Sequence, residues 1–361
     1  MAQNHTVTDK NLWVDNSIGE TDAVLYDVRE RPFEIYGLYS PLTEPEFKRM
    51  PDDIAASVSP EVATLARNTA GGRIRFSSDS MYVAIRAEMY EICRVPHMPL
   101  SGSAGFDLYI DVPGEGSRFR KSFMPSYQMK DGYESKISFY EKKMRYFTIN
   151  LPPYSGVKNL QIALQKGATV GEGLKYRNEL PVVFYGSSIT QGACASRPGN
   201  SYQNILSRRL NLDYLNFGFS GAGKAEEPML DYLASLPMMA FVCDYDHNAG
   251  TVEYLRNTHL NVYKKIRAAH PDIPFVMISR SDFDCAYDEN ILRRDVIIDT
   301  YRYARAQGDR NVYYVDGASI YRGPYAEMCT IDGVHPGDLG FALIADAIGA
   351  ELSRAFTQNK I

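Results

Sequence analysis

Hydrophobic and polar residues alternate along several short segments in the first half of the chain. From Met81 to Met89 every other position is apolar, which is the period of a strand with one buried face. Turn-forming residues separate such segments, as at 112–117 and 152–156. Short alternating segments with turns between them predict an antiparallel β-sandwich. The expected strands are Ile74–Phe76, Met81–Met89, Phe106–Asp111, Tyr146–Leu151 and Leu160–Leu164.

The second half has a different pattern, in which short, fully apolar segments alternate with longer helical ones. Uninterrupted apolar segments are typical of strands buried on both faces, and helices between them predict a parallel sheet covered on both sides. The expected strands are Val182–Tyr185, Tyr214–Phe217, Met239–Cys243, Phe275–Ile278 and Val312–Val315. The expected helices lie at Tyr202–Leu210, Val252–Ala269, Asn290–Ala306 and Leu339–Phe356.

The two patterns meet in the glycine-rich stretch Lys166–Gly173. We therefore predict an N-terminal β-sandwich domain at residues 1–175 and an α/β domain at residues 176–361. A chain of 361 residues is long enough for two domains with separate cores. Its 39 basic and 44 acidic residues give a net charge of −5 without a basic block, which disfavours nucleic acid as a partner.

Composition also narrows the expected location. No apolar run approaches the roughly 18 residues that cross a bilayer, so no membrane partner is expected. The first ten residues lack the apolar core of a signal peptide. The five cysteines are scattered and form no CxxC pair, which predicts free thiols and neither a disulfide framework nor a zinc knuckle. Free thiols are typical of a reducing compartment, so we expect a cytoplasmic protein.

Four polar or glycine-rich clusters follow the apolar segments of the second half. In an open parallel sheet, ligands bind beyond the carboxyl ends of the strands, so these clusters are expected to form one site. The clusters are Gly186–Gly192, Asn216–Gly223, Asp244–Asn248 and Asp332–Pro336.

In chain order, the four clusters resemble the four blocks of the SGNH (GDSL-type) hydrolase superfamily, which carry a serine, a glycine, an asparagine and a histidine. The matching residues are Ser188, Gly221, Asn248 and His335, with Asp332 three positions before the histidine. The resemblance covers about residues 180–355. The sequence departs from the family at Ser187, where many members have aspartate, and around Asn248, where Asp-His-Asn-Ala replaces Gly-x-Asn-Asp.

Acyl-transfer chemistry explains why these residue types are needed. A serine hydroxyl such as Ser188 becomes a nucleophile when a base removes its proton, and His335 is the natural base. Asp332 would fix the tautomer of the imidazole and stabilise the imidazolium. The resemblance implies that the Ser188 N–H, the Gly221 N–H and the Asn248 side-chain amide form the oxyanion hole.

Each cluster taken alone has a simpler interpretation. Gly186–Thr190 suits a strand-to-helix turn with capping hydroxyls, and it lacks the last glycine of the GxSxG elbow. Ser188 is preferred to Ser187 by the family spacing only. Gly221 and Asn248 also suit plain turns. The run from Asp244 to His247 offers three metal-binding side chains on one loop, but it has no partner motif, so we expect no metal.

A second resemblance extends over the first half. Gly105–Tyr109 reads Gly-Phe-Asp-Leu-Tyr and resembles the GxDLY signature of a β-domain that precedes some SGNH hydrolase domains. This implies an α/β fold in which a jelly-roll-like, antiparallel β-sandwich packs against a flavodoxin-like α/β/α hydrolase domain. Members of this subfamily are mostly carbohydrate esterase-like, and at least one branch transfers an acyl group to a natural-product scaffold.

Three further residues are candidates for substrate binding. Arg197 follows the nucleophile cluster and would bind a carboxylate or a hydroxyl-rich substrate, although a surface arginine fits equally well. His247 neighbours Asn248 and would contact substrate, although simple surface exposure is the favoured interpretation. His97 lies in the long segment 94–105, which would cover the site, although a structural turn with an exposed histidine is the default interpretation.

Together these observations predict a serine esterase that hydrolyses small acyl esters, with acetyl preferred, on a sugar or glycoside. It would form an acyl-enzyme on Ser188 and need no metal or organic cofactor. The partner is a small-molecule acyl ester, and the oligomeric state stays open. Two alternatives remain: an acyltransferase with the same triad, and a carbohydrate-binding protein without catalysis.

Overall fold

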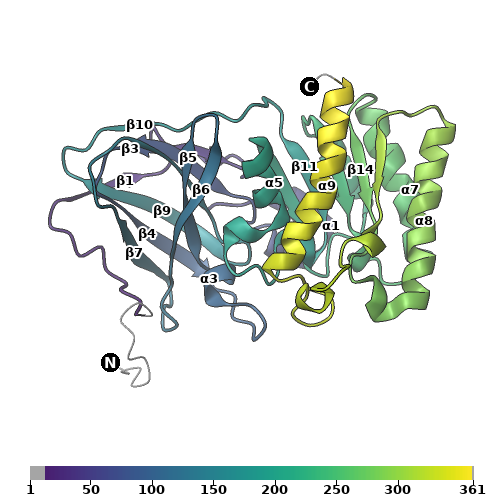
Figure 1. Cartoon of the computed structure of the whole chain (residues 1–361), viewed down its shortest axis with the longest axis horizontal. Helices are drawn as coiled ribbons and strands as arrows, with labels where there is room; N and C mark the ends of the chain where they lie inside the picture. The colour runs from purple at the N-terminus through teal and green to yellow at the C-terminus, as the bar shows by residue number, and fades with distance from the viewer. Residues whose placement is uncertain (1–12, 360–361) are drawn as a thin grey trace.

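The computed structural model describes residues 13–359. An all-β part and an α/β part lie side by side along the long axis of the molecule (Figure 1). The fold class predicted from the sequence is confirmed. Within the described residues, no helix has the length and apolar character needed to cross a membrane.

Two antiparallel sheets form the N-terminal part. One has the strand order β1-β9-β4-β7, and the other has the order β10-β3-β8-β5-β6 with β2 paired to β3. Apolar side chains from both sheets form one core; in β4, Val83 and Ile85 are buried whereas Arg86 is exposed. The strands are β1 (Ala23–Asp27), β2 (Glu34–Tyr36), β3 (Arg73–Ser78), β4 (Tyr82–Glu91), β5 (Phe106–Val112), β6 (Gly116–Phe123), β7 (Gly132–Ser138), β8 (Arg145–Asn150), β9 (Gly156–Gln165) and β10 (Val170–Glu172).

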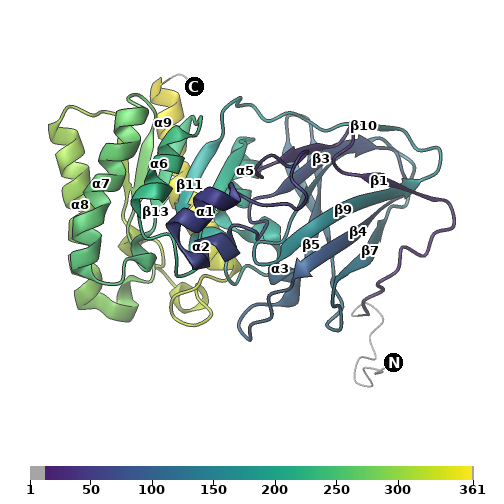
Figure 2. The ribbon, with the colours of Figure 1, turned by 180° about the vertical axis from the view of Figure 1, so that it is seen from behind.

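The C-terminal part is a parallel sheet with the strand order β12-β11-β13-β14-β15, which is the flavodoxin-like order. Helices α5 and α9 cover one face and helices α6, α7 and α8 cover the other (Figures 1 and 2). The strands are β11 (Val182–Gly186), β12 (Tyr214–Gly218), β13 (Ala240–Asp244), β14 (Phe275–Ile278) and β15 (Val312–Val315). The helices are α4 (Ser188–Gln191), α5 (Tyr202–Leu210), α6 (Glu227–Ser235), α7 (Val252–Ala269), α8 (Tyr287–Ala306) and α9 (Asp338–Asn359).

Two short helices of the N-terminal half pack on the C-terminal part. Helix α1 (Asp52–Val58) lies against α6, and α2 (Pro60–Leu65) packs on α1 (Figure 2). Their side chains Ala55 and Val62 belong to the same buried cluster as Leu230 of α6. The predicted boundary at residue 175 therefore does not coincide with the change of hydrophobic core, since this early segment completes the core of the α/β part.

Arg49 joins this segment to the parallel sheet. Its side chain is buried, and it donates hydrogen bonds to the carbonyl oxygens of Asn68 at 3.0 Å, Asn216 at 3.0 Å and Gly218 at 2.6 Å. Burial lowers the pKa of Arg49 to about 9. A buried cation is tolerated only when its donors are satisfied, so these carbonyls fix the carboxyl end of β12 relative to the N-terminal segment.

Candidate active site

The turn after β11 gives its two serines different environments. Ser187 is the N-cap of α4, and its Oγ accepts a hydrogen bond from the Ile189 N–H at 3.2 Å. Ser188 is the first residue of α4, so its own N–H has no acceptor within the helix. The capping hydroxyl that the sequence suggested is therefore Ser187, and the Ser188 hydroxyl is left for other contacts.

Gly186 makes this turn possible. A Cβ added at Gly186 would lie 2.0 Å from Thr190 Oγ1 and 2.4 Å from the carbonyl oxygen of Asp244. Both distances are far below van der Waals contact, so only glycine allows β11 to pass so close to β13 and α4. The close approach fixes the position of Ser188 at the end of the strand.

Ser188, His335 and Asp332 form one hydrogen-bonded chain. The Ser188 Oγ lies 2.9 Å from His335 Nε2, and His335 Nδ1 lies 2.7 Å from Asp332 Oδ2. The other oxygen of Asp332 accepts hydrogen bonds from the backbone N–H groups of His335 at 2.7 Å and Val334 at 3.0 Å. The loop before α9 thus holds the carboxylate and the imidazole, and α4 holds the hydroxyl, in the order that general-base catalysis requires.

The Asp332 carboxylate stays charged at neutral pH. Partial burial of Asp332 opposes its charged form, but the hydrogen bonds from His335 and Val334 outweigh this effect and lower the pKa of Asp332 to about 2. An ionised carboxylate at neutral pH stabilises a positive charge on the imidazole beside it.

Two of the predicted oxyanion donors, Gly221 and Asn248, lie around the same turn, but they differ in exposure and in their hydrogen bonds. Gly221 has a backbone φ of +64°, in the left-handed region that glycine adopts easily, and the residue is exposed. The Asn248 Nδ2 donates to the carbonyl oxygens of Phe219 at 2.9 Å and of Ala222. Asn248 therefore holds the turn that contains Gly221, and its use as a direct oxyanion donor stays a prediction.

The β-sandwich part supports the nucleophile from behind. Gln191 of α4 donates through Nε2 to Asn68 Oδ1 and to the Pro153 carbonyl, both at 3.0 Å, and its Oε1 accepts from the Ser220 N–H at 3.0 Å. The Tyr154 hydroxyl donates to the Ser188 carbonyl oxygen at 3.2 Å. Residues from both halves of the chain therefore position Ser188.

His97 lies beside the triad. It comes from the segment between β4 and α3 (Leu100–Ser103), and its ring centroid is 5.9 Å from that of His335. Helix α3, which follows this segment, contacts the loop after α4, because the Ser101 Oγ donates to the Ser196 carbonyl at 2.8 Å. The structure thus places the long loop of the N-terminal half against the triad, and a role of His97 in substrate binding stays a prediction.

Arg197 connects the loop after α4 to the β-sandwich part. Its Nη1 pairs with the fully buried Asp107 at 2.9 Å and contacts the Tyr109 hydroxyl, and its guanidinium lies 3.8 Å from the centre of the Phe119 ring. Asp107 and Tyr109 belong to the Gly105–Tyr109 motif, so the motif joins the two halves through Arg197. These contacts give Arg197 a structural role, and its use in substrate binding stays a prediction.

The acidic loop after β13 does not gather into a metal site. Asp246 forms an ion pair with Arg293 at 3.1 Å, whereas His247 Nε2 lies 2.8 Å from Asp282 Oδ1. Asp244 faces the hydroxyls of α4 and α5. The three side chains thus have three separate sets of partners. His247 is mostly buried and its hydrogen bond goes to Asp282, so its predicted contact with substrate stays a prediction.

The burial of Asp244 is expected to make the stability of the folded protein depend on pH. Its Oδ2 accepts from Thr190 Oγ1 at 2.9 Å and from the Tyr202 hydroxyl at 3.1 Å, yet burial raises the pKa of Asp244 to about 6. In an unfolded chain the pKa is about 3.9. Between about pH 4 and pH 6 the folded protein retains a proton that the unfolded chain has lost, so this group makes stability fall as pH rises through that window and adds no further change above it.

We expect Asp244→Asn to remove this pH dependence, because the amide keeps an acceptor oxygen without a charge. Relative to the parent, the variant should gain stability between about pH 4 and pH 6, by at most about 3 kcal/mol. Urea unfolding at several pH values from 4 to 8 measures the difference, with Asp295→Asn on the exposed face of α8 as the control. A difference that is constant with pH would contradict the assignment.

Cys194 lies beside the triad, and the sequence did not single it out as a functional residue. It lies just after α4, is 4% exposed and has a backbone φ of +70°. Burial, with the nearby charge of Asp332 adding to it, raises the pKa of the Cys194 thiol to about 11. The thiol is therefore protonated at neutral pH and does not compete with Ser188 as a nucleophile. No motif marks it, since its neighbours come from distant segments.

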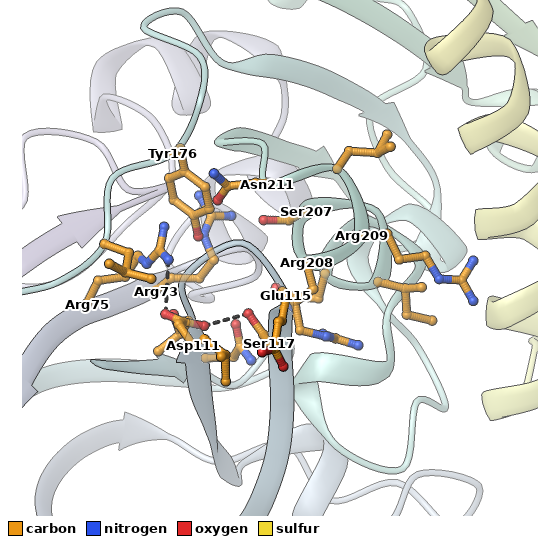
Figure 3. A pocket seen from close by; sticks show the side chains of 18 of the residues that line it. Arg73, Arg75, Asp111, Glu115, Ser117, Tyr176, Ser207, Arg208, Arg209 and Asn211 are labelled. Carbon is orange, nitrogen blue, oxygen red and sulfur yellow. Dashed lines mark hydrogen bonds and ion pairs between the residues drawn. The ribbon is translucent and has the colours of Figure 1, made fainter. Parts of the chain in front are cut away.

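A large cavity lies between the two halves of the chain and away from this chemistry. It has a volume of about 940 Å³, and Ser188, Asp332 and His335 are not among its lining residues (Figure 3). Two of the buried cations that line it form ion pairs: Arg75 with Asp111 at 2.9 Å, and Arg73 with Asp213. We therefore place the reaction at the triad and not in this cavity.

Both parts of the chain match known protein families. Residues 179–353 match the GDSL-like lipase/acylhydrolase family, and residues 24–170 match the GxDLY family, described as the N-terminus of SGNH-hydrolase-type esterases. A search of curated proteins found no match.

Solved structures share the fold over nearly the whole chain. A protein described as a GDSL-like lipase from Bacteroides ovatus is 25% identical, with a TM-score of 0.83 over 93% of this chain and 98% of that one. The salicylyl-acyltransferase SsfX3 from a tetracycline biosynthetic pathway is 19% identical, with a TM-score of 0.73 over 93% and 98% of the two chains. A family two carbohydrate esterase from Cellvibrio japonicus is 12% identical, with a TM-score of 0.61 over 93% and 98%. Both parts of the chain are thus matched, and the protein belongs to the SGNH (GDSL-like) esterases that carry an N-terminal GxDLY domain.

Proposed function

We propose that the protein is a serine esterase that hydrolyses small acyl esters, with acetyl preferred, on a carbohydrate or glycoside. The observation that carries this proposal is the continuous chain of hydrogen bonds, 2.9 Å from Ser188 Oγ to His335 Nε2 and 2.7 Å from His335 Nδ1 to Asp332 Oδ2. The Nε2 atom is within direct proton-transfer distance of the hydroxyl.

In the first half-reaction, Ser188 Oγ attacks the ester carbonyl carbon while its proton moves to His335 Nε2. The negative oxygen of the tetrahedral intermediate is stabilised by the Ser188 N–H and the Gly221 N–H. When the intermediate collapses, the bond to the alcohol breaks and His335 donates its proton to the departing oxygen. The acyl group stays on Ser188 as an ester.

In the second half-reaction a water molecule takes the place of the alcohol. His335 accepts a proton from the water as its oxygen attacks the acyl carbon, and then returns a proton to Ser188 Oγ. The products are the carboxylic acid and the regenerated enzyme. Asp332 stays ionised throughout, which its low pKa supports.

The substrate class is supported by resemblance rather than by a bound molecule. Structures that share this two-part fold include family two carbohydrate esterases, one of them solved in complex with cellohexaose. We infer that the alcohol portion is a sugar hydroxyl. A polar, hydroxyl-rich group suits the exposed His97 and the neighbouring segment that carries the Ser101 hydroxyl.

Acyl transfer is the second candidate. It is favoured by the similarity to the salicylyl-acyltransferase, which covers 98% of that chain. The same acyl-enzyme would form, and an alcohol instead of water would then attack it. The two functions differ only in which nucleophile reaches the acyl carbon.

A fluorophosphonate labelling experiment tests the proposal. The expected result is one adduct per chain on the peptide that contains Ser188, and no adduct in Ser188→Ala. Screening acetylated sugars, with and without an added alcohol, then measures the ratio of free acetate to new ester. Mostly acetate indicates an esterase, whereas mostly new ester indicates an acyltransferase. An adduct on another residue would contradict the nucleophile.

A further inference from the structure

Three side chains that bind metals converge beside the Ser188 hydroxyl. One potential ligand atom each from His97, Cys194 and His335 lies within 4.8 Å of the other two. They come from three separate segments: the loop between β4 and α3, the loop after α4, and the loop before α9. No short motif contains them, so only the folded chain brings them together.

The donor set selects a particular class of metal ion. A cysteine sulfur with two imidazole nitrogens suits Zn²⁺ and other thiophilic transition-metal ions, whereas Mg²⁺ and Ca²⁺ prefer oxygen ligands. Cys194 is a free cysteine, so its sulfur is not used in a disulfide. Three protein ligands leave a fourth tetrahedral position for water.

The surroundings of His335 also fit metal binding. Metal-binding histidines usually donate their second ring N–H to a carboxylate, which orients the ring. His335 Nδ1 lies 2.7 Å from Asp332 Oδ2, so Nε2 is the atom left to bind a metal. This Nε2 is also the atom 2.9 Å from Ser188 Oγ, and a metal there would occupy the lone pair that accepts the serine proton.

The three ligand atoms are close enough to surround a metal ion after a small movement. Zinc binds imidazole nitrogen at about 2.0–2.1 Å and sulfur at about 2.3 Å, so tetrahedral ligand atoms lie roughly 3.3–3.6 Å apart. The three atoms already lie within 4.8 Å of one another, and His97 is the exposed member. To complete the site, the ligand atoms have to approach one another by at most roughly 1.5 Å.

We propose that His97, Cys194 and His335 form a binding site for Zn²⁺ or a similar thiophilic divalent cation, and that the bound ion reversibly inhibits the triad. Binding replaces the proton of the Cys194 thiol, which is released to solvent. The inhibitory effect rests on the proposed function, whereas the binding does not.

Cobalt titration tests the binding directly. The full chain, freed of metal with a chelator, is titrated with Co²⁺ and its absorption is measured. One ion per chain is expected to bind, with a thiolate-to-cobalt charge-transfer band that disappears in Cys194→Ser. Ser188→Ala should retain the band, because it keeps all three ligands. Absence of the band from the parent, or its persistence in Cys194→Ser, would overturn the site.

Zinc titration of p-nitrophenyl acetate hydrolysis tests the inhibition. Zn²⁺ is expected to abolish turnover and a chelator to restore it. Cys194→Ala should keep the basal rate, since this side chain has no role in acyl transfer. Its half-inhibitory Zn²⁺ concentration should rise at least about tenfold, because one of three ligands is lost.

The matched control is Cys285→Ser, which removes an exposed thiol whose Sγ lies 2.7 Å from the Gly333 carbonyl beside Asp332. Its zinc sensitivity should equal that of the parent. If Cys285→Ser loses the sensitivity and Cys194→Ala retains it, the site is wrongly assigned. A parent that shows the cobalt band but hydrolyses no ester would refute the proposed function and leave the metal site standing.

Discussion

Replacing Ser188 with alanine is expected to abolish ester hydrolysis and to leave the fold intact. The substitution removes the only atom that can form the acyl-enzyme, so kcat should fall by roughly 10⁴- to 10⁶-fold, the range for loss of the nucleophile from a serine triad. The hydroxyl bonds to His335 and does not cap α4, so stability should change little. Initial rates with p-nitrophenyl acetate and a thermal melt measure the two effects.

Ser187→Ala is the matched control, because it removes the same atom one residue earlier. Ser187 caps α4, so its loss should lower the free energy of unfolding by about 1 kcal/mol. Its kcat should stay within the same order of magnitude as that of the parent. The opposite outcome, an active Ser188→Ala and an inactive Ser187→Ala, would show that the nucleophile is wrongly assigned.

The second large effect is expected from Asp332→Asn, with a fall in kcat of about 10⁴-fold. One oxygen at this position accepts two backbone N–H groups, from Val334 and His335, so the amide oxygen must stay there. The NH₂ group then faces His335 Nδ1, which forces the ring proton onto Nε2. In that tautomer Nε2 cannot accept the Ser188 proton, while KM should change little.

Asp338→Asn provides the control for a carboxylate on the adjoining segment. Asp338 accepts from the Ser196 N–H through Oδ1 at 2.9 Å and from the Ser196 hydroxyl through Oδ2. In the asparagine the amide oxygen can still accept from the N–H, and the amide NH₂ can donate to the hydroxyl oxygen. Its kcat should stay close to that of the parent. A loss of less than about tenfold in Asp332→Asn would contradict the proposed orientation of His335.

The low pKa of Asp332 also constrains the pH profile. Its charged form contributes stability that is fully present above about pH 4, where the unfolded chain is ionised as well, and that is lost as the pH falls toward 2. The acid limb of kcat/KM above pH 4 must therefore report another group.

The elements that could be predicted are those whose signal is local. Strands β11 and β13 lie in the centre of the parallel sheet and are buried throughout, so their apolar runs are continuous in the sequence. Strand β6 was missed because it is the edge strand of its sheet and largely exposed, which leaves no apolar alternation. Helices α1 and α2 were missed because they have only seven and six residues, which is too short for an amphipathic pattern to repeat in the sequence.

In the candidate site, too, some residues have a local signal in the sequence and others have none. Ser188, His335 and Asp332 follow elements with clear patterns, so their meeting at one sheet edge could be expected from topology. The places of Arg197 and Cys194 depend on contacts between loops of the two halves, and such contacts have no period in the sequence. The carbonyl partners of Asn248 likewise depend on how one turn closes, which no residue type specifies.

The packing of α1 and α2 has a consequence for dissecting the protein. A single cut near residue 175 would separate the catalytic sheet from the apolar side chains of residues 50–66 that cover it. The released C-terminal fragment would expose a bare hydrophobic surface and tend to aggregate. The C-terminal part therefore depends on the N-terminal half to cover its core, and a minimal active fragment would have to retain α1 and α2.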